Sequence, residues 1–111
     1  MFGDPKEKME HLAKKGQWEK LNQKATSADV KTRAAVAMAC GTTPDENAKN
    51  LLIPLLRDPS REVRLQAVRS IGLVGDGISK THLLMLEQDP NTDEEVKAAL
   101  KEAIHQISNR R

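Results

Sequence analysis

Residues 51–72 read LLIPLLRDPSREVRLQAVRSIG, and they contain two apolar runs separated by a short polar turn. The turn is Asp58-Pro59-Ser60, and in the second run Val63, Ala67 and Ile71 recur every four residues. This spacing predicts a helix with one apolar stripe. Because a pair of helices with one stripe each cannot bury both stripes alone, the unit needs similar units stacked on both sides.

The chain contains further copies of this unit. The apolar stripe of the second helix recurs 33 residues upstream and downstream, at Val30, Ala34 and Met38 and at Val96, Leu100 and Ile104. A basic residue follows the valine in each copy: Lys31, Arg64 and Lys97. The first helix recurs after only 31 residues, since the turn of the last copy has two extra residues, Asn91 and Thr92. Insertions in turns are typical of stacked repeats.

The pattern of the central copy, from Leu55 to Gly72, resembles the HEAT repeat, in particular the short HEAT-like repeats of bacteria and of phycobilisome lyase subunits. The last copy departs from the pattern at Lys97 and Leu100, and the first copy is degenerate in its turn, residues 26–29. The period of about 33 residues is shorter than the ~40 to 47 usual for this class, which favours the short variety. The resemblance implies an all-α fold, an α-solenoid of about three helical hairpins with an N-terminal capping helix.

We therefore expect a single domain over residues 1–111, with a cap (1–16), a degenerate repeat (17–41), a central repeat (42–75) and a C-terminal repeat (76–111). Helices are predicted near residues 5–15, 17–25, 28–40, 44–57, 61–74, 79–88 and 93–108. Capping residues are expected at Asp4, Ser27, Thr43, Ser79 and Thr92, and a kink is expected at Pro54. Three repeats are near the minimum for a stable stack, so the chain is either a complete small domain or part of a longer array.

Composition narrows the class of protein further. With 2% aromatic residues, the core must consist of Leu, Ile, Val, Ala and Met, and Trp18 is expected to pack against it. The formal charge of +2 gives no strong field for nucleic acid or anionic lipid. The single cysteine, Cys40, fits a reducing compartment and is interpreted as a small buried hydrophobe. The longest apolar run, residues 34–40, is far shorter than the ~20 residues that span a bilayer, so a cytoplasmic protein is expected.

No motif for catalysis, a metal or a cofactor stands out. No histidine is followed by glutamate, and paired-cysteine zinc spacing is absent. The glycine-rich residues 72–77 follow a helix and lack the Lys-Ser/Thr ending of a phosphate-binding loop. The sequence therefore predicts a protein that is not an enzyme and holds no cofactor.

The resemblance also implies that the second helices line a concave binding face. The positions expected to contact a partner are Arg33, Leu65, Gln66, Arg69, Glu102 and His105, although such positions can also be merely solvated. The first hypothesis is a protein-binding module or adaptor. A second is a nucleic-acid binder that uses Arg33, Arg64, Arg69 and nearby lysines as phosphate contacts, and a third is an accessory subunit of a chromophore lyase.

HEAT-like families commonly join adjacent repeats by a ladder of hydrogen bonds from basic side chains to the turn aspartates. Here the resemblance implies Asp58 and Asp89 as acceptors, with Arg64 and Lys97 as the cations and Lys31 as the cation of the degenerate copy. A guanidinium can make a two-pronged contact that lysine cannot, so the contact at Arg64 is expected to be the strongest. Arg33 and Arg69 then remain as the expected partner contacts.

Overall fold

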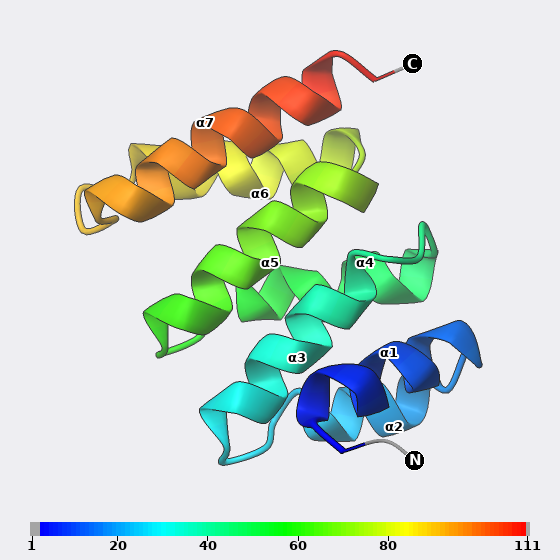
Figure 1. Cartoon of the computed structure of the whole chain (residues 1–111). Coiled ribbons are helices and arrows are strands. Elements are labelled where there is room, and N and C mark those ends of the chain that lie inside the picture. Colours follow the sequence, from blue (N-terminus) through cyan, green and yellow to red (C-terminus); the bar gives the residue numbers. More distant parts are fainter. Residues whose placement is uncertain (1–2, 111) are drawn as a thin grey trace.

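The computed structural model describes residues 3–110, and every regular element among them is an α-helix (Figure 1). The helices are α1 (Pro5–Lys14), α2 (Trp18–Lys24), α3 (Val30–Cys40), α4 (Glu46–Leu55), α5 (Arg61–Val74), α6 (Gly77–Gln88) and α7 (Glu94–Ser108). Each boundary lies within two residues of its predicted position. The all-α prediction is confirmed.

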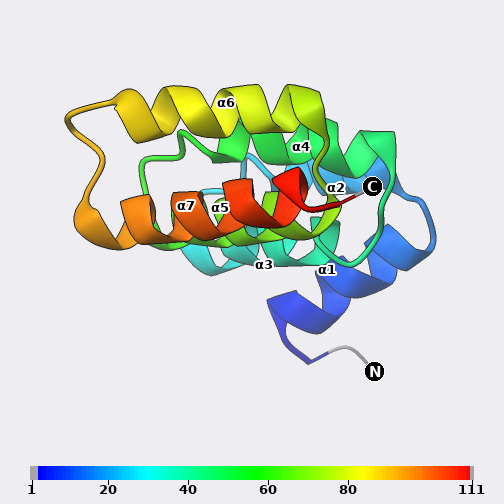
Figure 2. The ribbon, with the colours of Figure 1, turned by 90° about the horizontal axis from the view of Figure 1, so that it is seen from above.

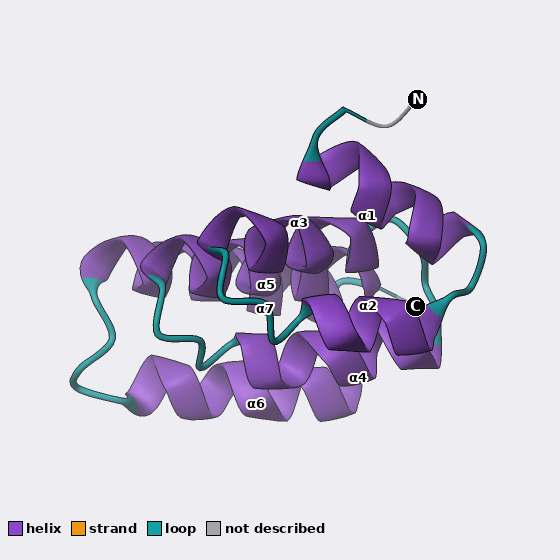
Figure 3. Cartoon of the chain, turned by 90° about the horizontal axis from the view of Figure 1, so that it is seen from below, coloured by secondary structure: helices purple, strands orange, loops and turns teal. Residues whose placement is uncertain are grey.

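The helices form two layers (Figure 2). The first-helix layer contains α2, α4 and α6, and the second-helix layer contains α3, α5 and α7 in a row, with α1 beside α3 at one end of it. The turns within the hairpins α2–α3, α4–α5 and α6–α7 lie along one edge of the molecule, and the connections between hairpins lie along the other (Figure 3). The molecule measures 40 × 31 × 18 Å. This is the predicted stack of three hairpins with an N-terminal capping helix.

Aspartates cap most of the helices. Asp4 caps α1 as predicted and accepts a hydrogen bond from the Glu7 amide at 2.8 Å. Four further helices begin at an aspartate where the sequence predicted a nearby serine or threonine: Asp29, Asp45, Asp76 and Asp93, in place of Ser27, Thr43, Ser79 and Thr92. A carboxylate brings a full negative charge to the positive end of the helix, so it is the stronger acceptor for the free amides.

Helix α4 is shorter than predicted. It ends at Leu55, one residue after Pro54, instead of continuing through a kink to Arg57. Proline lacks an amide hydrogen and its ring crowds the preceding turn, so it is tolerated poorly inside a helix. Pro54 therefore lies in the last turn of α4, close to the Asp58 turn.

The buried face of α3 differs from the predicted stripe. Val30, Ala34 and Met38 are only partly buried, whereas Val36 and Cys40 are completely buried. Helix α3 carries apolar side chains on most of its circumference, so the spacing of apolar residues does not single out one face. Trp18 packs against the core as predicted.

Small residues allow the helices of the second-helix layer to approach closely. A Cβ atom added to Gly41 would lie 2.5 Å from the Ser70 Oγ, and one added to Gly72 would lie 3.1 Å from both the Cα and the Cβ of Ala103. The Ser70 hydroxyl donates a buried hydrogen bond of 2.6 Å to the Ala37 carbonyl. Each glycine thus marks a close contact with the following hairpin.

Candidate functional site

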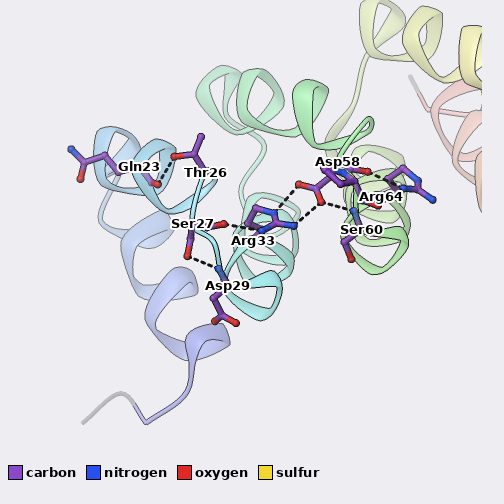
Figure 4. Close-up of polar contacts among 9 residues, drawn as sticks. Gln23, Thr26, Ser27, Asp29, Arg33, Asp58, Ser60 and Arg64 are labelled. Carbon is purple, nitrogen blue, oxygen red and sulfur yellow. Dashed lines mark hydrogen bonds and ion pairs between the residues drawn. The ribbon is translucent and has the colours of Figure 1, made fainter.

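Arg33 joins the first hairpin to the second. Its Nε and Nη2 donate to the two carboxylate oxygens of Asp58 at 2.9 and 3.1 Å, and its Nη1 donates to the Ser27 carbonyl at 2.8 Å (Figure 4). The Arg33 and Asp58 side chains are 14% and 6% exposed. The hydrogen bonds that Arg33 donates to the Asp58 carboxylate raise the pKa of Arg33. This two-pronged, shielded contact has the geometry that makes arginine–carboxylate pairs strong.

Arg64 occupies the equivalent position in the second hairpin. Its Nη1 donates to the carbonyl six residues earlier, that of Asp58, at 2.8 Å, as Arg33 does to Ser27. The local turns also match, because the Asp29 amide donates to the Ser27 hydroxyl and the Ser60 amide to the Asp58 carboxylate. The structural counterpart of Arg64 is therefore Arg33, at a spacing of 31 residues, and not Lys31 at 33.

This equivalence changes the assignment of the ladder. The predicted acceptor, Asp58, does bind an arginine two-pronged, but that arginine comes from the preceding hairpin. Within residues 3–110, the hydrogen bonds of Arg64 go to two carbonyl oxygens, those of Asp58 and Pro59. Arg33, which was expected to contact a partner, has its guanidinium engaged within the chain.

The contact predicted at Asp89 is not formed in the same way. One Asp89 oxygen accepts from the Asn91 amide at 2.9 Å, and among residues 3–110 no cation pairs with this carboxylate. The Lys97 Nζ lies 4.0 Å from the Oε1 of Glu94 in its own helix. The second and third hairpins are joined instead by Arg61, which pairs with Asp93 at 3.1 Å and with Glu95.

A further ion pair connects α4 to the start of α6. The Lys49 Nζ lies 2.9 Å from the Asp76 carboxylate and 3.1 Å from that of Glu46. The hydrogen bond from Lys49, together with that from the Ser79 amide, lowers the pKa of Asp76 to about 2. Asp76 therefore caps α6 and holds it against α4 at the same time.

The other predicted partner positions fall into two groups. Arg69, Glu102 and His105 are exposed, whereas Gln66 is partly buried and Leu65 is buried. Two grooves cross the solvent side of the second-helix layer. The α1–α3–α5 groove has a volume of about 370 Å³ and includes Gln66 in its lining.

The second groove lies between α5 and α7 and has a volume of about 410 Å³. Its lining residues, which define the α5–α7 groove, are Arg69, Leu73, Glu95, Ala98, Ala99, Glu102, Ala103 and Gln106. Leu73, which is 61% exposed, was not among the predicted partner positions. Its position outside the apolar stripe of Val63, Ala67 and Ile71 was the sequence signal that could have identified it as exposed.

The described residues give no support for a reactive cysteine, a metal site or a membrane-spanning helix. Cys40 is completely buried, and burial raises the pKa of its thiol to about 12. Within residues 3–110, no three His, Cys, Asp or Glu side chains are arranged to hold a metal ion. None of the helices in that range is both long and apolar enough to cross a membrane.

The stacked antiparallel hairpins and their close helix packing define the α-solenoid class. The sequence model for HEAT repeats matches residues 19–105, and the chain belongs to the HEAT-repeat family. HEAT repeats generally mediate protein–protein interaction. Comparison with curated protein sequences gives no match.

Proposed function

We propose that this protein is a non-catalytic binding module or adaptor that holds a partner protein in the α5–α7 groove. The observation that carries the proposal is the floor of this groove, where Ala98, Ala99 and Ala103 leave a hollow beside the exposed Leu73. A large exposed apolar side chain next to an apolar hollow favours contact with an apolar anchor of a partner.

The charged rims of the groove indicate the chemistry of that partner. Arg69 lies on the α5 side, and Glu95 and Glu102 lie on the α7 side. Among residues 3–110, Arg69 and Glu102 form no ion pair, so both charges are available. The complementary segment has an apolar anchor, with an acidic side chain toward α5 and a basic one toward α7.

The nucleic-acid alternative receives less support. Of the three arginines expected to contact phosphate, Arg33 is paired with Asp58, whereas Arg64 and Arg69 form no ion pair among residues 3–110. The formal charge of +2 gives no strong field to gather a polyanion. The role as an accessory lyase subunit, like the likeness to short bacterial repeats, remains an expectation from the repeat type.

The test is quantitative affinity capture from the source cell with matched variants. Leu73→Lys places a charge at the groove, and Met85→Lys places the same charge at a similarly exposed apolar residue of α6, 56% exposed, in the other layer. We expect a specific partner to be retained by the wild type and Met85→Lys and lost from Leu73→Lys, with unchanged thermal unfolding of all three. Equal retention by both variants would exclude the groove. A captured partner should then lose affinity for Arg69→Glu by about tenfold or more, since a rim charge is reversed.

A further inference from the structure

A further cavity lies between the second and third hairpins, at the edge of the molecule that carries the turns within the hairpins. Its volume is about 360 Å³, and its charged lining includes Arg57, Arg64, Asp89 and Asp93. It does not share residues with the α5–α7 groove. The cavity and the groove are therefore two separate candidate sites.

The first hairpin shows which group an arginine in this position binds. Arg33 anchors its Nη1 on a carbonyl and uses its Nε and Nη2 edge to bind the Asp58 carboxylate. Arg64 anchors its Nη1 on the equivalent carbonyl. Its Nε and Nη2 edge has no partner among residues 3–110, and Arg64 lines the cavity.

The carboxylate that would correspond to Asp58 is that of Asp89, 31 residues later. The turn that holds it contains the two extra residues Asn91 and Thr92. The Asn91 amide donates to Asp89 at 2.9 Å, and the Thr92 hydroxyl donates to the Leu86 carbonyl at 2.8 Å. These bonds hold the longer turn in a conformation in which Asp89 lines the cavity without pairing with Arg64.

The remaining charges favour an anion in the cavity. Asp93 accepts a hydrogen bond from the Val96 amide and pairs with Arg61, and this hydrogen bond together with the charges of Arg61 and Arg64 lowers the pKa of Asp93. Asp58, which also lines the cavity, is paired with Arg33. Among the lining charges that form no ion pair within residues 3–110, two are positive, Arg57 and Arg64, and one is negative, Asp89.

We propose that this cavity binds the carboxylate of an aspartate or glutamate side chain from a partner protein. The Nε and Nη2 edge of Arg64 receives the two carboxylate oxygens, as Arg33 receives those of Asp58, and Arg57 adds a second positive charge. Asp89 opposes binding by repulsion. The site is equivalent to the Arg33–Asp58 contact one hairpin earlier, but its carboxylate would come from the partner.

The experiment is a titration of the whole chain, labelled with ¹⁵N, with N-acetyl-glutamate N-methylamide, a blocked amino acid with one carboxylate. We expect saturable shifts of the Arg64 Nε–Hε resonance and of backbone amides in residues 57–64 and 89–93. N-acetyl-glutamine N-methylamide, which has the same shape without the charge, is the control. An equal response to both compounds, or no response, would overturn the proposal.

Two variants identify the atoms responsible. Arg64→Lys keeps a donor for the Asp58 carbonyl but loses the two-pronged edge, so its affinity should fall by about tenfold. Asp89→Asn removes the opposing charge and should strengthen binding several-fold, whereas a loss of binding in this variant would contradict the proposed arrangement. Unfolding curves confirm that each variant is folded, and Arg57→Gln, expected to weaken binding, gives an independent measurement if Arg64→Lys does not fold.

Discussion

The Arg33 guanidinium in α3 and the Asp58 carboxylate after α4 form a two-pronged ion pair that joins two successive hairpins, with N–O distances of 2.9 and 3.1 Å. Both groups are largely shielded from water, and each also bonds to the backbone. The pair therefore connects not only two side chains but also two turns.

Replacement of Arg33 by glutamine should lower the free energy of unfolding by about 1–3 kcal/mol, because the Asp58 carboxylate loses its charged donor. Urea denaturation followed by circular dichroism measures this loss. Arg69→Gln is the control, since Arg69 is exposed and has no ion pair among residues 3–110, and its effect should stay within ~0.5 kcal/mol. Similar losses in the two variants would show that the pair with Asp58 contributes little.

Gly72→Ala should be destabilising by about 1 kcal/mol, because the new methyl group would meet the Gln106 side chain and lie 3.1 Å from the Cα and Cβ of Ala103. The cost of overpacking α5 against α7 should exceed the gain in helix propensity from replacing a glycine inside α5. Gly77→Ala is the matched control. A Cβ at Gly77 meets no atom within 4 Å, so this change should be neutral or slightly stabilising. Thermal unfolding of both variants compares them directly, and a neutral Gly72→Ala would mean that the two helices are not tightly packed there.

The ion pair of Asp76 with Lys49 predicts a specific pH dependence of stability. The pKa of Asp76 is lowered from 3.8 to about 2, so its contribution is fully present above pH 3.8 and is lost as the pH falls through about 2. Asp76→Asn retains a capping side chain. It should remove the part of the acid-induced loss of stability that comes from this ion pair. At neutral pH the loss should be below ~1 kcal/mol, because the Asp76 side chain is 44% exposed.

Urea unfolding between pH 2 and pH 5 provides the measurement. Lys49→Met removes the other partner, and the double variant should show little more loss than either single one. If Asp76→Asn lost stability with acid as steeply as the wild type, the ion pair would not be the source of the dependence.

Cys40 should be chemically silent in the folded protein. Its thiol is completely buried and its pKa is raised to about 12, so almost no thiolate forms near neutral pH. A chromogenic disulfide reagent at pH 8 should react only after urea unfolds the chain. Rapid labelling of the native protein would indicate that α3 opens locally.

Local sequence signals were sufficient for the helices and their order. Three hairpins were predicted from the Asp58-Pro59 turn, from the stripe of Val63, Ala67 and Ile71, and from the recurrence of turn and stripe. These signals were sufficient because they depend on residues close in the chain. Among the ladder residues, the sequence identified Asp58 as an acceptor. It also marked the exposed Arg69 and Glu102, which lie in the α5–α7 groove.

Only the tertiary structure decided the register of α3 and the partners of the two arginines. Alanines surround much of α3, so the face that becomes buried is chosen by the helices packed against it. Arg33 and Arg64 are the same residue type at equivalent positions, but the stack brings the Asp58 carboxylate to the Nε and Nη2 edge of Arg33. Among residues 3–110, Asp89 in the longer last turn forms no ion pair, and the same edge of Arg64 has no hydrogen-bond partner. The pairing of charged side chains between hairpins depends on the distance between the hairpins. That distance is determined by packing rather than by the spacing of residues along the chain.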